Sequence, residues 1–193
     1  LDQRPQQHSA QTQLPQMKWD LRWKRFCFVV DCKPVQQVAC GHSVLQEPVL
    51  TPSFEAITDN IASFYSYGWY PAKPWNDPIC WRPRSHNLVA DFLVNYTMDH
   101  CRTWSVIYDW PFPGVSINAC NFVAHSDGGT RRDSCSASAW IVEAGYLKDF
   151  KWVYQPLALS GTFFDRPMSS FTVEALALEE CTIFVKKFLE RMR

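Results

Sequence analysis

Apolar runs of strand type and of helix type follow one another along the first part of the chain. Residues 26–30 (FCFVV) are unbroken and β-rich, which is typical of a strand buried on both faces, and the run ends directly in Asp31. Lys33 and Pro34 then open a predicted helix through Val38, because proline suits the first helical turn. The pattern therefore begins with a strand, an acid and a short helix.

A longer helix is predicted over residues 54–67, where apolar side chains recur near helical spacing. Thr51-Pro52-Ser53 precedes it as a start signal, and Gly68 ends it. The next segment, residues 69–78, holds three prolines and two tryptophans, which predicts a loop.

A short strand at residues 79–81 leads to a third predicted helix at residues 88–98. The polar residues 85–87 supply capping side chains, and Asp91 falls in the first turn of this helix. Residues 99–119 then follow no regular period. We expect them to form an irregular connector that crosses the surface of the fold.

The second half of the chain begins with a hairpin pattern over residues 121–140. Apolar residues approach Asp127, and Gly128 and Gly129 directly after it predict that the strand breaks into a turn there. Asp127 therefore belongs to the first strand of the predicted hairpin. Two more strands and a final helix are predicted, at residues 137–144, 152–159 and 172–191.

Four carboxylates occupy related positions, since two end or lie on strands and two begin helices: Asp31, Asp127, Asp91 and Glu174. Mg²⁺ binds oxygen ligands and often takes only a few protein carboxylates together with substrate phosphate. Two such ions can activate a water and stabilise the leaving oxygen when a phosphodiester is cleaved. Each acid taken alone is also explained as a helix cap or a strand-end residue, so the hypothesis of a metal site depends on the four together.

Composition constrains the function only weakly. The 193 residues are 47% hydrophobic, which is enough for one compact core. The formal net charge is zero and the isoelectric point is near 7.1, so any nucleic-acid binding has to use a local patch. Nine tryptophans and thirteen phenylalanines mainly serve to fill a core, although aromatic rings can also stack on bases.

The eight cysteines include no CxxC pair and no clustered histidine and cysteine spacing, so a structural zinc is not predicted. Cys27, Cys120 and Cys181 lie inside apolar runs, as buried free thiols do. We therefore expect a reduced, intracellular protein. The sequence contains no signal peptide and no apolar run near the length of a membrane span, so we expect no membrane partner.

The first residues differ in composition from the rest. Six glutamines and two prolines among residues 1–16 predict a mobile arm over residues 1–20. The chain starts at Leu1, which is consistent with excision from a longer protein.

Four segments resemble the motifs of the ribonuclease H type 1 family. HSDGGTRR (125–132) resembles its first hairpin, and SSFTVEALALEE (169–180) resembles its acidic first helix. FVVDCKPVQQV (28–38) is similar to the strand, aspartate and helix that normally come next. RPRSHNLVADFLVN (82–95) is similar to the closing segment, whose pattern is N-x-x-A-D-x-L.

These motifs occur in an exchanged order, which a circular permutation explains. Residues 21–98 correspond to the usual C-terminal half and residues 120–193 to the usual N-terminal half, while residues 99–119 join the old ends. The implied fold is one α/β domain over residues 21–193, with helices on both faces of a mixed five-stranded sheet. Its first three strands form an antiparallel meander that contains Asp127, and the strand that bears Asp31 lies parallel beside the first. The alternative is a swapped dimer, in which halves of neighbouring copies complete each other.

The resemblance also implies an activity. Asp127, Glu174 and Asp31 would bind one or two Mg²⁺ ions, for which Mn²⁺ can substitute, and Asp91 would complete the second site. The reaction would cut the RNA strand of an RNA–DNA hybrid and leave a 5′-phosphate and a 3′-hydroxyl. Discrimination would come from the 2′-hydroxyls in the shallow groove. The domain would belong to a retroelement polyprotein that carries a reverse transcriptase.

Further residues are candidates for substrate contact and proton transfer. Where the family often has asparagines for groove contacts, this chain has serines, and it lacks the basic helix and loop with which some members grip the hybrid. The candidates for substrate contact are Ser169, Ser170, Arg131, Arg132, Arg84 and, by stacking, Trp69. For the arginines, a role as solvated surface residues explains the sequence equally well.

The mobile histidine of the family has no clear match. His125 precedes Asp127 by two residues and would share its side of the strand, so it is the better candidate for proton transfer. His86 lies five residues before Asp91 at the predicted start of a helix, and it is the second candidate.

Two other functions remain open on the sequence. A binding or scaffolding module could keep the fold without turnover, although none of the four carboxylates is lost. A nuclease of the same fold could cleave DNA in place of the RNA strand. Comparison of hybrid, RNA and DNA duplexes as substrates distinguishes these functions.

Overall fold

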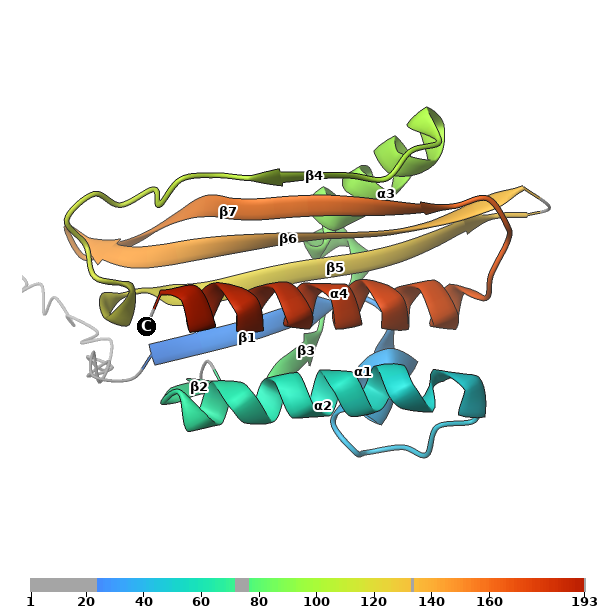
Figure 1. Ribbon diagram of the computed structural model, residues 1–193, viewed down its shortest axis with the longest axis horizontal. Coiled ribbons are helices and arrows are strands. Elements are labelled where there is room, and N and C mark those ends of the chain that lie inside the picture. Colours follow the sequence, from blue (N-terminus) through green and yellow to red (C-terminus); the bar gives the residue numbers. More distant parts are fainter. Residues whose placement is uncertain (1–23, 72–76, 133, 193) are drawn as a thin grey trace, which may run out of the picture.

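The computed structural model describes residues 24–71, 77–132 and 134–192 (Figure 1). The predicted arm over residues 1–20 and part of the predicted loop over residues 69–78 lie outside the described residues. Within the described part, no helix is both long enough and apolar enough to cross a membrane.

The centre of the fold is a seven-stranded mixed sheet. Its spatial order is β2-β1-β5-β6-β7-β4, and β3 also pairs with β1. The strands are β1 (Lys24–Val30), β2 (Trp69–Pro71), β3 (Ile79–Trp81), β4 (Trp104–Ile107), β5 (Asn121–Arg131), β6 (Cys135–Lys148) and β7 (Lys151–Phe164).

The predicted core of the sheet is confirmed. Strands β5, β6 and β7 form an antiparallel meander, and β1 runs parallel beside β5. Both halves of the sequence therefore contribute to one sheet within one chain. Strands β6 and β7 have 14 residues each and extend well beyond the predicted segments, because their pairing continues almost to the hairpin tip.

The predicted count of five strands was wrong, because the sheet gains short strands on both sides. Strand β2 pairs with the first half of β1 and β3 with the second half, so the two are consecutive pieces of one strand position. Strand β4 lies in the connector over residues 99–119 and pairs with β7 at the sheet edge. The predicted short strand at residues 79–81 is confirmed as β3. Strands β2 and β4 were not predicted, because three or four residues are too few to show a period and backbone pairing decides their structure.

The four helices of the described residues are those that the sequence predicts, the first from its proline and the others from apolar spacing or capping residues. They are α1 (Lys33–Ala39), α2 (Thr51–Ser66), α3 (Leu88–His100) and α4 (Ser170–Arg191). Three single turns of 3₁₀ helix accompany them: η1 (Pro48–Leu50), η2 (Arg84–His86) and η3 (Ile117–Ala119).

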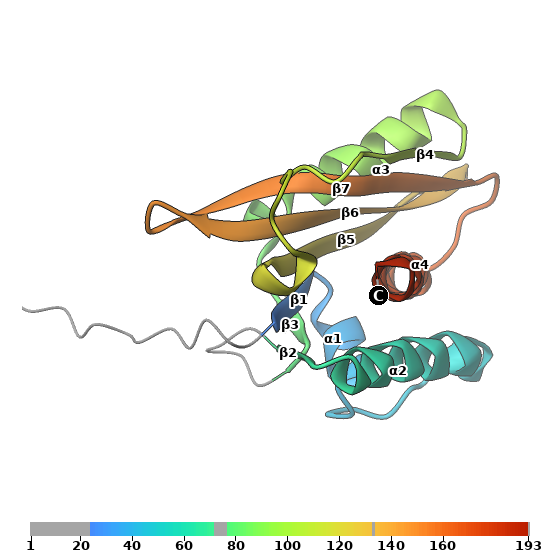
Figure 2. The same ribbon diagram turned by 60° about the vertical axis from the view of Figure 1, so that its left-hand side comes forward.

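The helices cover both faces of the sheet (Figure 2). Helix α3 packs on one face, where Val94 and Met98 contact alternate residues of β6 such as Ala139. Helix α4 packs on the other face with α1, and α2 lies against α4 as a further layer. A buried hydrogen bond of 3.1 Å from Asn60 to the hydroxyl of Thr182 joins α2 to α4. The two cores thus meet at the sheet that carries Asp127.

All eight cysteines lie in the described residues, and none is joined in a disulfide. The prediction of buried free thiols is confirmed for Cys27, Cys120 and Cys181.

Candidate metal centre

Three of the four predicted carboxylates converge at one place. One oxygen of each of Asp31, Asp127 and Glu174 lies within 4.8 Å of the others. Asp31 directly follows β1, and Val29 of β1 is level with His125 of β5. Two residues further along both strands, the same register brings Asp31 beside Asp127. Parallel pairing between distant parts of the sequence therefore builds the first half of the cluster.

Glu174 reaches the cluster from α4. Ser169 is the N-cap of this helix, because its hydroxyl accepts a hydrogen bond of 3.0 Å from the Thr172 backbone. The helix thus begins at Ser170, two residues before the predicted start, and Glu174 lies in its second turn instead of the first.

Gly128 is what allows α4 to come so close. A Cβ atom at this position would lie 2.4 Å from the backbone nitrogen of Glu174 and 2.4 Å from the carbonyl carbon of Val173. At Gly129 a Cβ would lie 2.6 Å from a methyl group of Val94 in α3. The predicted turn at these two glycines was therefore wrong: the strand continues to Arg131, and the glycines admit helices on its opposite faces.

Asp127 and Glu174 are buried, Asp31 is half-buried, and the cluster is incompletely hydrogen-bonded. Asp127 is 2% exposed and Glu174 is 6% exposed. The Gly128 backbone donates a hydrogen bond of 2.8 Å to Asp127 Oδ1. Among the described residues, no partner reaches Asp31 Oδ1, Asp127 Oδ2 or Glu174 Oε2, although all three atoms are buried.

These surroundings favour the neutral acids in the absence of a cation. Burial, and then the charges of the neighbouring carboxylates, raise the pKa of both Asp127 and Glu174. A divalent cation reverses this preference, since it offers each unpaired oxygen an opposite charge. Three carboxylates with free oxygens are ligands that Mg²⁺ or Mn²⁺ prefers, so the residues fit such an ion.

Asp91 lies outside this group of three. It is in the first turn of α3, as predicted, where Arg84 donates from Nε to its Oδ1 at 2.8 Å and also from Nη2. Its charge contributes to the raised pKa of Asp127, so it lies near enough to influence the cluster. Arg84, a predicted phosphate contact, is thus held by Asp91.

Asn87 connects the start of α3 to β5, the strand that carries Asp127. The sequence had predicted only a capping role for this residue. Its amide Nδ2 donates a hydrogen bond of 2.9 Å to the carbonyl of Ser126, and its Oδ1 lies 3.2 Å from Nδ1 of His125. Asn87 is buried, and its side chain makes no cap hydrogen bond. The N-x-x-A-D pattern was the sequence signal for this contact. Its asparagine, Asn87, bonds to β5, while its aspartate, Asp91, lies in the first turn of α3.

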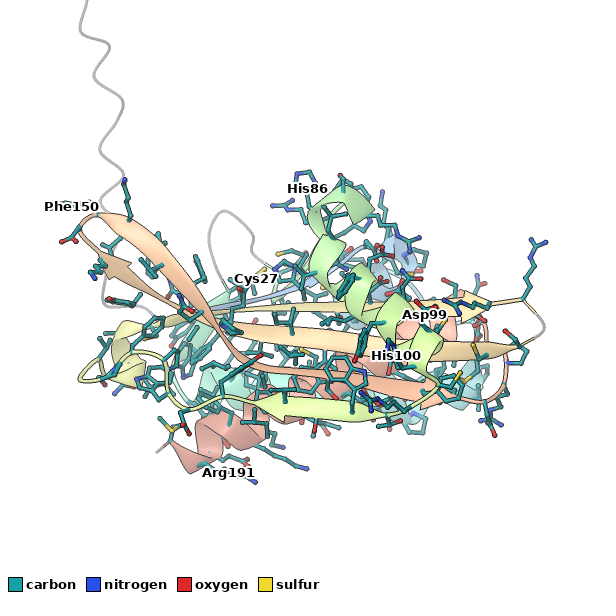
Figure 3. The ribbon with its side chains drawn as sticks, turned by 90° about the horizontal axis from the view of Figure 1, so that it is seen from above. Cys27, His86, Asp99, His100, Phe150 and Arg191 are labelled. Carbon is teal, nitrogen blue, oxygen red and sulfur yellow. The ribbon has the colours of Figure 1, made fainter. Side chains whose placement is uncertain are left out.

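The two candidate histidines border one cavity of about 160 Å³. It is lined by Ser85, His86, Leu88, Val89, His125, Ile141 and Glu143. Burial lowers the pKa of His125, which favours its neutral form. His86 is exposed at the end of η2, just before α3, while Asp99 and His100 lie at the far end of α3 (Figure 3).

The predicted substrate contacts have different surroundings. Ser169 caps α4, and Ser170 is exposed as its first residue. Arg131 forms an exposed ion pair with Asp99, and Arg132 is exposed in the turn after β5.

Trp69 was wrongly predicted to stack on substrate. It is 2% exposed, lies in β2 and packs on Phe122 with ring centroids 4.7 Å apart. Parallel pairing with β1 draws this part of the proline-rich segment into the core.

Comparison of the chain with protein-family models and with curated proteins found no match.

Proposed function

We propose that this chain is a metal-dependent nuclease of the ribonuclease H type, which hydrolyses the RNA strand of RNA–DNA hybrids. The observation that carries the proposal is the convergence of Asp31, Asp127 and Glu174, each with a buried oxygen that has no partner among the described residues. Leaving one buried oxygen of each acid without a hydrogen-bond partner is costly, and unpaired polar atoms of this kind need an explanation. A bound cation supplies one.

The arrangement of the strands and helices supports the same class of protein. The meander β5-β6-β7, the parallel neighbour β1 and the helix α4 carry the acids in the relation that the exchanged order of motifs implies. In this proposal, Asp31, Asp127 and Glu174 hold Mg²⁺, and Asp91 is the candidate ligand for a second ion. Mg²⁺ bound at such a site activates water for attack and stabilises charge on the leaving oxygen.

His125 is the proposed proton acceptor. Because Nδ2 of Asn87 donates to a carbonyl, the oxygen of the same amide faces His125 and requires a proton on Nδ1. The other ring nitrogen, Nε2, is then free of a proton in the neutral ring. His125 can therefore accept a proton from the cavity that it lines, two residues before Asp127 on β5.

Cleavage of a labelled RNA strand tests the proposal. The strand is presented in an RNA–DNA hybrid and in an RNA duplex, beside a DNA duplex, with Mg²⁺, Mn²⁺ or EDTA. We expect metal-dependent cutting of the hybrid alone, its loss in Asp127→Asn, and full activity in the matched control Asp59→Asn, an exposed acid on α2.

Each other result has a definite meaning. Cutting of the DNA duplex would identify a DNA nuclease of the same fold. Binding of the hybrid by the folded protein without cutting in any metal would identify a binding module and overturn the enzymatic proposal.

A further inference from the structure

A second group of metal-ligating side chains lies at the other end of α1. Cys40 offers its sulfur, His42 a ring nitrogen and Asp77 a carboxylate oxygen, and these three atoms lie within 4.8 Å of one another. His42 Nε2 and Asp77 Oδ2 are 3.1 Å apart. Asp31 precedes α1 and Cys40 follows it, so about 10 Å of helix separates this group from the acid cluster.

The end of α1 places Cys40 and His42 together. Gly41 has a φ of +73°, and its backbone N–H bonds to the carbonyl of Val38 at 3.0 Å. The chain then folds back, so that the His42 N–H bonds to the carbonyl of Gln37 at 2.7 Å. Cys40 and His42 are thus held by the end of the helix, by the left-handed conformation of Gly41 and by the backbone that folds back.

Asp77 is positioned by the sheet. The next residue, Pro78, accepts a hydrogen bond of 2.9 Å from the Phe28 backbone, and β3 then pairs with β1. The thiol of Cys40 lies 3.8 Å from the carbonyl of Ile79, which fixes the contact between the helix end and β3. The pairing of β3 with β1 therefore positions Asp77, whereas the end of α1 positions Cys40 and His42.

The chemistry of the three atoms points away from Mg²⁺. A thiolate and an imidazole are ligands for Zn²⁺ and related transition metals, whereas Mg²⁺ prefers oxygen alone. Tetrahedral zinc with ordinary bond lengths requires ligand separations of about 3.3–3.6 Å. The His42–Asp77 separation of 3.1 Å is close to this range, and the Cys40 sulfur lies within 4.8 Å of both atoms. Gln36 lies 3.6 Å from the Cys40 sulfur and donates its amide N–H to it, as an outer partner of a thiolate ligand does.

The fourth position would face water. The side chains of His42 and Asp77 are 52% and 43% exposed. A site with three protein ligands and one solvent position is a common form of zinc coordination.

We propose that Cys40, His42 and Asp77 bind one zinc ion, which ties the end of α1 to the start of β3. The site is separate from the proposed nuclease centre and does not depend on it. Sequence spacing failed to predict zinc because Asp77 is 35 residues from His42 and only the fold brings them together. The competing explanation is a simple ion pair between His42 and Asp77 beside an unrelated thiol.

Cobalt binding to the metal-free chain tests this site. Co²⁺ bound to a thiolate absorbs light through sulfur-to-metal charge transfer, a signal that oxygen ligands alone do not give. We expect one Co²⁺ per chain with this absorption, displaced by Zn²⁺ and retained in excess Mg²⁺. The Asp127→Asn variant should give the same signal, which separates the zinc site from the acid cluster.

Variants of the ligands complete the test. Cys40→Ser should abolish the absorption, and His42→Ala and Asp77→Asn should each weaken binding by at least about tenfold. Cys101→Ser, a change to an exposed cysteine after α3, is the matched control and should bind normally. Should Cys40→Ser fail to fold, the two exposed ligands His42 and Asp77 still decide the matter. The proposal would be overturned if the wild-type chain gave no such absorption, if Cys40→Ser kept it, or if Cys101→Ser lost it. Unchanged affinity for Co²⁺ in both His42→Ala and Asp77→Asn would overturn it as well.

Discussion

At the scale of single residues, Asp127 is expected to destabilise the metal-free protein. It is buried among other acids, and one of its oxygens has no partner among the described residues. Asp127→Asn should therefore raise the free energy of unfolding in EDTA at pH 8 by about 1–3 kcal/mol, as urea denaturation would measure. The same change should remove stabilisation by Mg²⁺. The control Asp59→Asn should change stability by less than about 0.5 kcal/mol, and a less stable Asp127→Asn protein in EDTA would contradict this view of the cluster.

The pH dependence of stability follows from the same acids. The folded-state pKa values of Asp127 and Glu174 lie above the ordinary values of 3.8 and 4.5. The folded state therefore binds protons more tightly at these two acids than the unfolded state does. This stabilises the fold fully at a pH below the ordinary pKa values, and the stabilisation is lost as the pH rises through the folded-state pKa values. In EDTA, unfolding should become easier between pH 5 and pH 8, and Mg²⁺ should stabilise the protein more at pH 8. Thermal denaturation at both pH values, with and without Mg²⁺, measures this. Equal stabilisation by Mg²⁺ at the two pH values would refute it.

The sequence predicted part of the site at this scale. Asp31, Asp127 and Glu174 could be grouped because strand ends and a helix start carry them. The pairing of Asp91 with Arg84 depends on a short 3₁₀ turn, which leaves no pattern. Trp69 was misassigned because buried and exposed aromatic residues look alike in a proline-rich segment.

At the scale of elements, Gly128 controls the distance between β5 and α4. A Cβ at this position would meet helix backbone, which cannot rotate away as a side chain can. Gly128→Ala should destabilise the fold by about 1–3 kcal/mol and move Glu174 away from Asp127, so that Mg²⁺ no longer raises the melting temperature.

Gly68→Ala is the matched control for this change. Its φ of +76° makes an alanine strained by about 1–2 kcal/mol, but apart from the two chain neighbours no atom of the described residues lies within 4 Å of the added methyl group. This variant should lose stability and keep its response to Mg²⁺. A Gly128→Ala protein with a normal response to Mg²⁺ would show that the close approach is not needed for the site.

Apolar patterns predicted the long elements and, among the short strands, only β3. Helices α2, α3 and α4 and the long strands follow apolar patterns of several turns or residues, while α1 was predicted from the proline in its first turn. The three-residue β2 and the four-residue β4 have none, and pairing with β1 and β7 decides them. A pair of glycines such as Gly128 and Gly129 is typical of a turn. In this fold their missing side chains allow α4 and α3 to pack closely against the two faces of β5.

At the scale of the whole molecule, the site requires both halves of the chain. Asp31 belongs to the first half, while Asp127 and Glu174 belong to the second, and all three meet within one chain. Asp31→Asn and Asp127→Asn proteins, each inactive, should therefore remain inactive after they are unfolded and refolded together. In a swapped dimer, one site of each mixed pair would contain only unchanged residues, and about a quarter of the activity would return. Such recovery of hybrid cleavage would contradict closure within one chain.

The central claim is that the three converging carboxylates form a metal centre, and counting bound Mn²⁺ by electron paramagnetic resonance tests it most directly. Mn²⁺ takes the same oxygen ligands as Mg²⁺ and is visible to the method. The wild-type chain and Asp59→Asn should bind one or two Mn²⁺ ions that Mg²⁺ displaces, while Asp127→Asn and Glu174→Gln should lose this binding. Equal binding of Mn²⁺ by all four folded proteins, or by none of them, would contradict the account.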